Sequence, residues 1–111
     1  MKKIQEKLIS GGYCDERGVG FAANAELLPN GSYGIVLLCL KGNELTIYDT
    51  DMQTNPGRVI ARIPLKEAEG LKVKGLLIKS LKFKYRGFEY CFKNLLGLNA
   101  QLEIIAGESR G

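Results

Sequence analysis

The sequence contains no histidine among its 111 residues. It therefore lacks the side chain that most often transfers protons in catalysis and that completes mixed zinc sites. A glycine-rich phosphate loop at the start of a helix is also missing, and so is a serine in a nucleophile-elbow pattern. Because catalysis needs groups placed for proton transfer, nucleophilic attack or metal binding, we expect that the chain is not an enzyme and that it uses no cofactor.

Cysteine is scarce, and the three examples are Cys14, Cys39 and Cys91. An odd number without a close pair disfavours both a disulfide framework and a zinc site, so no metal site is predicted. Cys39 and Cys91 lie in apolar strand segments, where a free thiol behaves as a small hydrophobic side chain. Cys14 precedes Asp15 and Glu16, whose charges discourage the thiolate, and we expect it to be a poor nucleophile.

Long hydrophobic runs are absent as well. The longest uninterrupted one covers residues 35–40, IVLLCL, whereas a membrane-spanning helix needs about 20 apolar residues. The opening residues, MKKIQEKLIS, are charged and are followed by no apolar segment of the kind found in signal peptides. We therefore expect a cytoplasmic protein.

The length fits a single domain over residues 1–111, since no shift in composition marks a linker. The net charge is +4, but it is unevenly spread. Residues 71–93 hold seven basic residues against Glu89 alone, a net charge of +6, which leaves −2 for the rest of the chain. Clustered Lys and Arg of this kind attract anionic lipid or nucleic acid.

The spacing of apolar residues predicts a mainly β protein with a helix at each end. A short N-terminal helix occupies an extension over residues 1–12 and stops at Gly11 and Gly12. Seven antiparallel strands would form a β-barrel over about residues 18–95. The strand candidates are residues 19–28, 32–40, 45–51, 58–65, 71–79, 81–85 and 88–94.

The connections between these strands carry turn residues. Turns are predicted at residues 29–31, 42–43, 55–57 and 86–87, and a turn-like or short helical connection at residues 66–70. Pro64 should end its strand or place it at a sheet edge, because proline cannot donate to a ladder. An amphipathic helix over about residues 99–106, within a capping segment of about 97–107, is expected to start at Asn94 or Asn99 and to stop at Gly107.

Alternation of apolar and polar residues predicts which side chains face the core. In the predicted strand at residues 45–51, Leu45 and Ile47 should point inward, with Thr46 and Tyr48 outward. In the last hairpin a single register puts six side chains inward. They are Leu81, Phe83, Tyr85, Phe88, Tyr90 and Phe92.

Two sets of charged residues are candidate sites. Asp49 and Asp51 stand two apart in a strand and so share a face, where they could bind a hard cation, although such a pair more often marks a solvated approach to a turn. The second set is basic and consists of Lys82, Lys84 and Arg86 on one strand face together with Lys72 and Lys74 on another. Side chains on neighbouring strands within a Debye length add their fields and could contact an anion or lipid. The alternative is that these lysines only keep the outer strand faces soluble.

Three stretches resemble the pleckstrin-homology (PH) superfamily, and particularly its small bacterial PH-like and GRAM-like domains. They are NELTIYDTD at residues 43–51, IPLKEAEGLKV at residues 63–73, and the glycine followed by a basic hairpin at residues 75–92. The resemblance implies a PH-like barrel of two near-orthogonal sheets, of four and three strands, capped by the C-terminal helix, and it brings no catalytic residues. In eukaryotic relatives the phosphoinositide site draws on basic residues around the loop between the first two strands. Here residues 23–34 contain Glu26 and no Lys or Arg, so that site does not carry over.

Two functional hypotheses follow. The first is a non-enzymatic cytoplasmic interaction module that binds a protein partner or assembles with itself, since pairing at a strand edge needs no special side chains. The alternative is peripheral binding to an anionic membrane surface through the basic late hairpins. Nucleic acid is the least favoured partner, because single-strand platforms expose aromatic rings that this chain places in its core. No small-molecule substrate is inferred.

Overall fold

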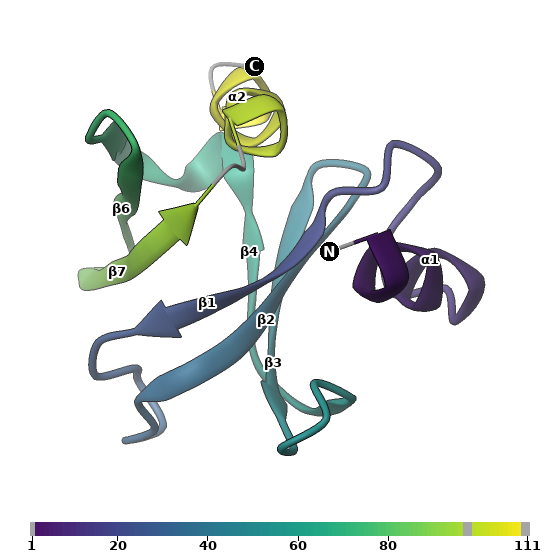
Figure 1. The fold of residues 1–111 in the computed structure, drawn as a ribbon. Coiled ribbons are helices and arrows are strands. Elements are labelled where there is room, and N and C mark those ends of the chain that lie inside the picture. The colour runs from purple at the N-terminus through teal and green to yellow at the C-terminus, as the bar shows by residue number, and fades with distance from the viewer. Residues whose placement is uncertain (1, 97–98, 110–111) are drawn as a thin grey trace.

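The computed structural model describes the backbone of residues 2–96 and 99–109, and the side-chain exposure of residues 6–95 and 100–109. Its elements follow the predicted order of a helix, seven strands and a helix (Figure 1). They are α1 (Lys2–Ser10), β1 (Gly20–Ala25), β2 (Gly34–Lys41), β3 (Glu44–Thr50), β4 (Pro56–Pro64), the 3-10 helix η1 (Leu65–Glu67), β5 (Glu69–Lys74), β6 (Ile78–Tyr85), β7 (Phe88–Leu96) and α2 (Asn99–Ser109). None of the helices described here is long and apolar enough to cross a membrane.

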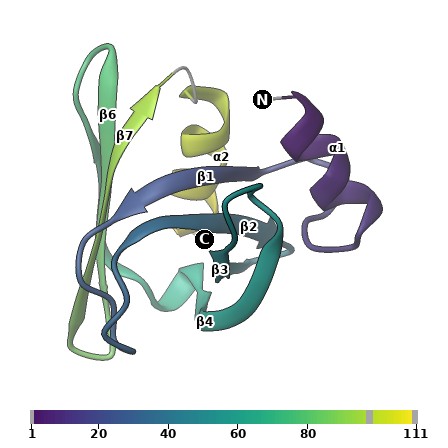
Figure 2. The ribbon, with the colours of Figure 1, turned by 60° about the horizontal axis from the view of Figure 1, so that its bottom comes forward.

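The seven strands are all antiparallel and form one continuous sheet in the order β4-β3-β2-β1-β7-β6-β5. A group of four strands and a group of three meet at a short junction, where Asn24 and Ala25 of β1 pair with Lys93 and Phe92 of β7. Figure 2 shows β6 and β7 running across the direction of β1 and β2. α2 packs against η1 and β5 and buries Leu102 and Ile105. The predicted mainly β fold of seven antiparallel strands, with a C-terminal helix packed on it and a short N-terminal helix, is confirmed, although the two predicted strand groups belong to one continuous sheet.

The last hairpin adopts the predicted register. Its inward pairs are Leu81 with Phe92, Phe83 with Tyr90, and Tyr85 with Phe88. Four of these six side chains are buried, while Tyr85 and Phe88 are partly buried at the hairpin end. The Phe83 and Tyr90 rings stack with centroids 5.1 Å apart, and of the side chains that alternate with these residues Lys82, Lys84 and Glu89 are exposed and Cys91 is half-buried.

α1 packs on the outer face of the sheet and forms a second, smaller apolar cluster there. Leu8 is fully buried against Leu37 and Cys39. Thr46 lies on this outer face, as predicted, opposite Cys39, but only 5% of it is exposed. Tyr48 also lies there, half-buried, and packs edge-on against Tyr13, with ring centroids 5.3 Å apart. Leu45 and Ile47 point inward as predicted.

Two predicted turns are confirmed by backbone angles that favour primed hairpin turns. Gly42 has φ +61 between β2 and β3, and Arg86 and Gly87 have φ +50 and +78 between β6 and β7. β4 ends at Pro64, as predicted, and lies at an edge of the sheet.

Several boundaries differ from the predictions. The first strand ends at Ala25 instead of residue 28, and the turn predicted at residues 55–57 lies earlier, so that Pro56 and Gly57 already belong to β4. The predicted strand at residues 71–79 breaks at Gly75, whose φ of +106 bends the chain between β5 and β6. The predicted connection at residues 66–70 is shorter, because β5 begins at Glu69.

The C-terminal helix also differs at both ends. Asn94 does not cap it but lies within β7, with φ +61. α2 begins at Asn99 and runs through Gly107 to Ser109. Gly107 therefore does not stop the helix; an added Cβ there would meet nothing within 4 Å, so the helix passes through it without steric constraint.

Candidate anion-binding surface

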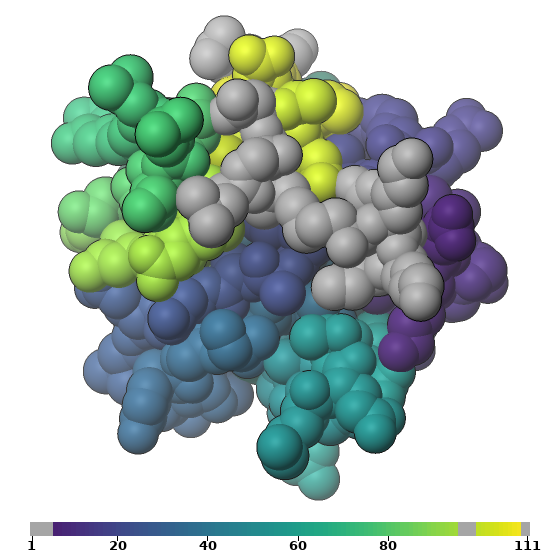
Figure 3. Space-filling view, in the orientation of Figure 1, coloured from purple at the N-terminus to yellow at the C-terminus, as the bar shows by residue number. Residues whose placement is uncertain are grey.

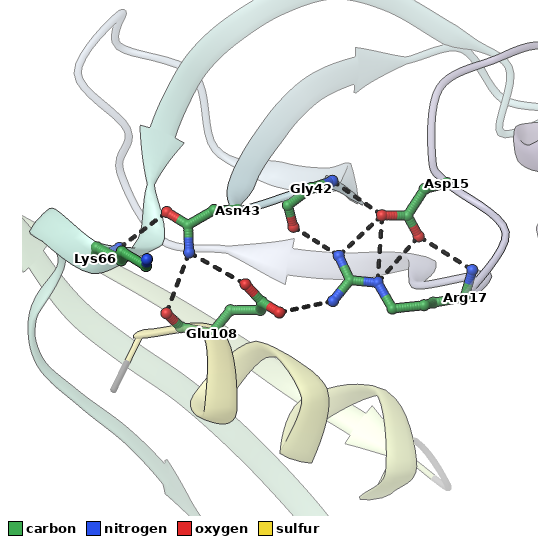
Figure 4. Close-up of polar contacts among 6 residues, drawn as sticks. All are labelled: Asp15, Arg17, Gly42, Asn43, Lys66 and Glu108. Carbon is green, nitrogen blue, oxygen red and sulfur yellow. Dashed lines mark hydrogen bonds and ion pairs between the residues drawn. The ribbon is translucent and has the colours of Figure 1, made fainter. Parts of the chain in front are cut away.

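One polar cluster joins segments that are distant in sequence (Figure 4). The Arg17 guanidinium donates to the Asp15 and Glu108 carboxylates, each at 2.8 Å, and to the Gly42 carbonyl at 2.6 Å. The Asn43 side-chain amide donates to the backbone carbonyl and the carboxylate of Glu108, both at 3.2 Å. Hydrogen bonding from Arg17 lowers the pKa of Asp15 to about 2. Because each carboxylate here already faces the Arg17 cation, we interpret this cluster as a structural clamp, and we call it the Arg17 clamp.

Asp49 and Asp51 serve the loop between β3 and β4. Asp49 accepts the backbone N–H of Arg58 at 2.5 Å. Asp51 accepts the backbone N–H groups of Gln53 and Asn55, both at 2.9 Å, and the Asn55 side-chain amide, also at 2.9 Å. Within the described residues no group of three or more potential metal ligands is present. The geometry favours the turn-approach interpretation over a cation site.

The cysteines are poor nucleophiles by position. Cys14 is buried, and its burial, followed by the nearby Asp15 charge, raises its pKa. Burial raises the pKa of Cys39 to about 12. Cys91 differs from the prediction, because it lies half-buried on the outer face of β7, opposite Lys82, instead of among apolar side chains. Its pKa is also raised by burial.

The predicted basic row is interrupted by carboxylates from neighbouring strands. Lys72 of β5 and Lys82 of β6 are directly opposite each other, but Lys82 forms an ion pair with Glu89 at 3.2 Å. Lys84 has Glu69 on one side and Glu89 on the other as its cross-strand neighbours. The sequence shows Glu89 in the row but does not show that Glu69 lies beside it.

Arg86 does not share a site with Lys74, contrary to the expectation of one common field. Arg86 lies in the turn between β6 and β7, with its guanidinium carbon 5.3 Å from the centroid of the Tyr85 ring. Lys74 is opposite Ser80 at the other end of β6. Six residues of strand span about 20 Å, which exceeds a Debye length of about 8 Å at physiological ionic strength.

Two surface hollows lie on this hairpin face. The mixed-charge hollow, of about 330 Å³, is lined by Glu69, Gly70, Lys72, Lys82, Phe83, Lys84 and Glu89. The lysine hollow, of about 300 Å³, is lined by Lys74, Gly75, Ile78, Lys79, Ser80, Lys93 and Asn94. The Glu69 and Glu89 carboxylates repel an anion from the mixed-charge hollow. The charged residues that line the lysine hollow are all lysines. The lysine hollow is therefore the stronger candidate for binding an anion.

A β-bulge builds the lysine hollow. Lys79 pairs with Leu95 and Leu81 pairs with Phe92, so Ser80 alone faces two residues of β7, Lys93 and Asn94. The extra residue leaves Lys93 and Asn94 both exposed, because a bulge changes the alternation of side chains between the two faces. Sequence reasoning missed Lys79 and Lys93 as site residues. The one sequence signal for the bulge was Asn94, because asparagine adopts positive φ more often than most residues.

Three consecutive apolar residues project beside this hollow. Leu76 is 91% exposed, Leu77 85% and Ile78 59%, and we call them the apolar tip. They form the connection from β5 into β6, which stands out at the upper left of the molecule in Figures 1 and 3. Gly75 and Ile78 belong to the lining of the lysine hollow, so the tip and the hollow are continuous.

A second apolar group lies near the loops that precede β2 and β4. A hollow of about 560 Å³ is lined by Ile35, Thr50, Asp51, Met52 and Thr54. Met52 is fully exposed and Ile35 55% exposed. This surface carries no lysine or arginine in its lining.

Comparison with known proteins gives a likeness in structure alone. No protein-family model matches the sequence, and no curated protein matches it. Among solved structures, the chain is similar to Inner Membrane Complex Sub-compartment Protein 3 (ISP3) from Toxoplasma gondii, with a TM-score of 0.54 and 16% sequence identity. The match covers 99% of this chain and 86% of that one. At this level of identity the two proteins are shown to share a fold.

Proposed function

We propose that this chain is a non-enzymatic docking module of the bacterial PH-like and GRAM-like type that binds an anionic membrane surface peripherally. The observation that carries the proposal is the apolar tip, three exposed apolar side chains beside a hollow lined by three lysines. This observation supports the second of the two hypotheses drawn from the sequence, and we propose that the contact lies at the β5–β6 end instead of the middle of the basic hairpin.

The apolar tip supplies the hydrophobic part of the binding free energy. Moving a Leu or Ile side chain out of water is worth about 1.5 to 3 kcal/mol when burial is complete. Partial insertion of three such side chains into the interfacial region would therefore contribute on the order of 3 to 5 kcal/mol. Exposed apolar residues in a contiguous group on a soluble fold mark an interaction surface.

Lysines beside the tip supply the electrostatic part. Lys74 and Lys79 flank Leu76–Ile78 in sequence and line the lysine hollow. Each basic residue near an anionic leaflet contributes about 1 kcal/mol. Neither Lys74 nor Lys79 forms an ion pair within the described part of the chain, so no internal carboxylate reduces their attraction to lipid.

Vesicle sedimentation tests the proposal with charge-matched variants. Lys74→Gln/Lys79→Gln should reduce binding to vesicles that contain phosphatidylserine by about 10- to 30-fold, the equivalent of two lost basic contacts. Lys84→Gln/Arg86→Gln removes the same charge at the far end of the hairpin and should reduce binding by less than about threefold. Leu76→Ser/Leu77→Ser should weaken binding at every salt concentration. Equal losses for the two charge variants would refute docking through this end.

Protein interaction, including self-assembly, is the second candidate function. Its supporting observation is the separate apolar group around Ile35 and Met52, which lies in a hollow without lysines. Size-exclusion chromatography with light scattering, on the wild type and on Ile35→Ser/Met52→Ser, tests self-assembly. A species larger than the monomer that the substitutions dissociate would support it, and a strictly monomeric wild type at high concentration would exclude it.

A further inference from the structure

One lysine of the lysine hollow already has an internal partner. Lys93 forms an ion pair with Glu26 at 2.7 Å. The backbone N–H of Glu26 donates to the carbonyl of Cys91 at 3.0 Å, which holds the Glu26 backbone beside β7. An anion that entered the hollow would have to compete with the Glu26 carboxylate for the Lys93 ammonium.

The Glu26–Lys93 pair is open to competition from solvent. The Lys93 side chain is 58% exposed and that of Glu26 is 51% exposed. Ion pairs with this exposure are weak, because water and salt screen them. A phosphate group carries more charge than a carboxylate and offers several strong acceptor oxygens, so it can displace Glu26 from Lys93.

The other groups in the hollow suit a phosphate. Its lining includes three lysines together with Ser80 and Asn94, residue types whose side chains can all donate hydrogen bonds to phosphate oxygens. The hollow has a volume of about 300 Å³ and is open to solvent, which leaves room for a phosphate group.

We propose that the lysine hollow binds one phosphate group, and that Glu26 is an internal carboxylate that competes with it for Lys93. This inference rests on the proposed membrane function for its biological ligand, a phosphate-bearing lipid headgroup. It goes beyond that function by naming the site and a residue that limits its affinity. Removing the Glu26 charge should therefore strengthen binding, whereas most surface substitutions weaken it or leave it unchanged.

The chain contains a matched control for this effect. Glu89 and Lys82 form a second carboxylate–lysine pair on the same hairpin face, 3.2 Å apart and with side chains 58% and 51% exposed. Neither residue lines the lysine hollow. Glu26→Gln and Glu89→Gln each change the net charge by +1 and each release one lysine, but only Glu26→Gln releases a lysine of the hollow.

The experiment measures binding of the full chain to vesicles of phosphatidylcholine with phosphatidic acid. Glu26→Gln should tighten binding about fivefold, the equivalent of one basic contact at a membrane surface, and should steepen its salt dependence. Glu89→Gln should change it less than about twofold. In a Lys93→Gln background the Glu26→Gln substitution should have no further effect. Equal effects of Glu26→Gln and Glu89→Gln, or no effect of either on bound protein, would overturn the inference.

A second arm separates the sources of the phosphate. Inorganic phosphate is titrated into the protein while the amide NMR signals of Ser80 and Asn94 are followed. Shifts at both residues that saturate at lower phosphate in Glu26→Gln would support the hollow even if the wild type binds no vesicles, in which case the membrane function alone fails. A Glu26→Gln gain on vesicles without these shifts would assign the site to a lipid headgroup. Absence of both vesicle binding and phosphate shifts would overturn both proposals.

Discussion

Gly75 and Gly107 are two glycines in opposite surroundings, and they show how single residues set the geometry of the site. Gly75 has φ +106, and an added Cβ would lie 2.1 Å from the carbonyl oxygen of Ile78. An L side chain at this position therefore needs a backbone shift. The bend that Gly75 permits is what turns Leu76–Ile78 out of the sheet and into the apolar tip.

Gly75→Ala should destabilise the protein by about 1 to 3 kcal/mol. Gly107→Ala, in a helix and with no atom near the added Cβ, should stabilise it by up to about 1 kcal/mol. Urea unfolding of both variants measures the difference. A neutral Gly75→Ala would contradict the close approach of the chain to Ile78.

Phe83 and Phe92 test the register of the last hairpin. Both rings are buried, with exposures of 1% and 0%, so Phe83→Ala and Phe92→Ala should each cost about 3 to 5 kcal/mol. Lys84→Ala, on the opposite face of β6, should change the free energy of unfolding by less than about 0.5 kcal/mol. Urea titrations of the three variants provide the comparison, and the reverse ranking would require the hairpin to be inverted.

At the scale of elements, the Arg17 clamp ties the end of α2 to the β2–β3 turn and to the segment before β1. Its contribution depends on the charge of Asp15, whose pKa is lowered from 3.8 to about 2, first by the hydrogen bond from Arg17. A carboxyl whose pKa is lower in the folded state adds stability above its unfolded pKa, and this stability is lost as the pH falls through the folded pKa. The clamp therefore holds at neutral pH and weakens between about pH 4 and pH 2.

The thermal midpoint of the wild type should fall more steeply over this pH range than that of Arg17→Gln. The variant should have a lower thermal midpoint at pH 7, but its midpoint should fall less on acidification, because it lacks the Arg17 hydrogen bond that lowers the pKa of Asp15. Calorimetry between pH 7 and pH 2 gives both curves. Parallel curves would show that Arg17 does not control the charge of Asp15.

The strands themselves follow from local pattern, because alternation of apolar and polar residues marks a two-sided sheet. Local pattern does not predict which other elements cover each face of the sheet. Thr46 is buried on the outer face opposite Cys39, where Leu8 and Tyr13 help to form a second apolar cluster, and residues 45–51 alone do not predict that cluster. In the same way Leu76 and Leu77 extend an apolar strand pattern, and only the positive φ of Gly75 turns them into an exposed tip.

At the scale of the whole molecule, the site depends on strand neighbours that are distant in sequence. The positive charge between residues 71 and 93 is visible in the composition; the four predicted lysines lie on β5 and β6, and Arg86 lies in the turn between β6 and β7. The sequence does not show that Glu26, from the loop after β1, reaches Lys93 of β7, or that the bulge at Asn94 gathers Lys74, Lys79 and Lys93 around one hollow. These relations arise only when β1 pairs with β7 and joins the two groups of strands into one sheet.

The barrel thus presents two different ends to its surroundings. One end carries the apolar tip and the lysine hollow, and another surface carries the apolar hollow around Met52, without basic residues in its lining. If the membrane is the partner, the orientation of the bound domain is fixed, with the β5–β6 connection inserted and Met52 left in water.

The most direct test of this orientation uses single tryptophans, because the chain has none of its own. Leu77→Trp and Met52→Trp each place one fluorescent reporter on a fully or largely exposed apolar position. On vesicles that contain phosphatidylserine, the emission of Leu77→Trp should shift to shorter wavelength and be quenched by brominated lipid, while that of Met52→Trp should stay unchanged. A blue shift for Met52→Trp alone, or for neither variant, would contradict docking through the apolar tip.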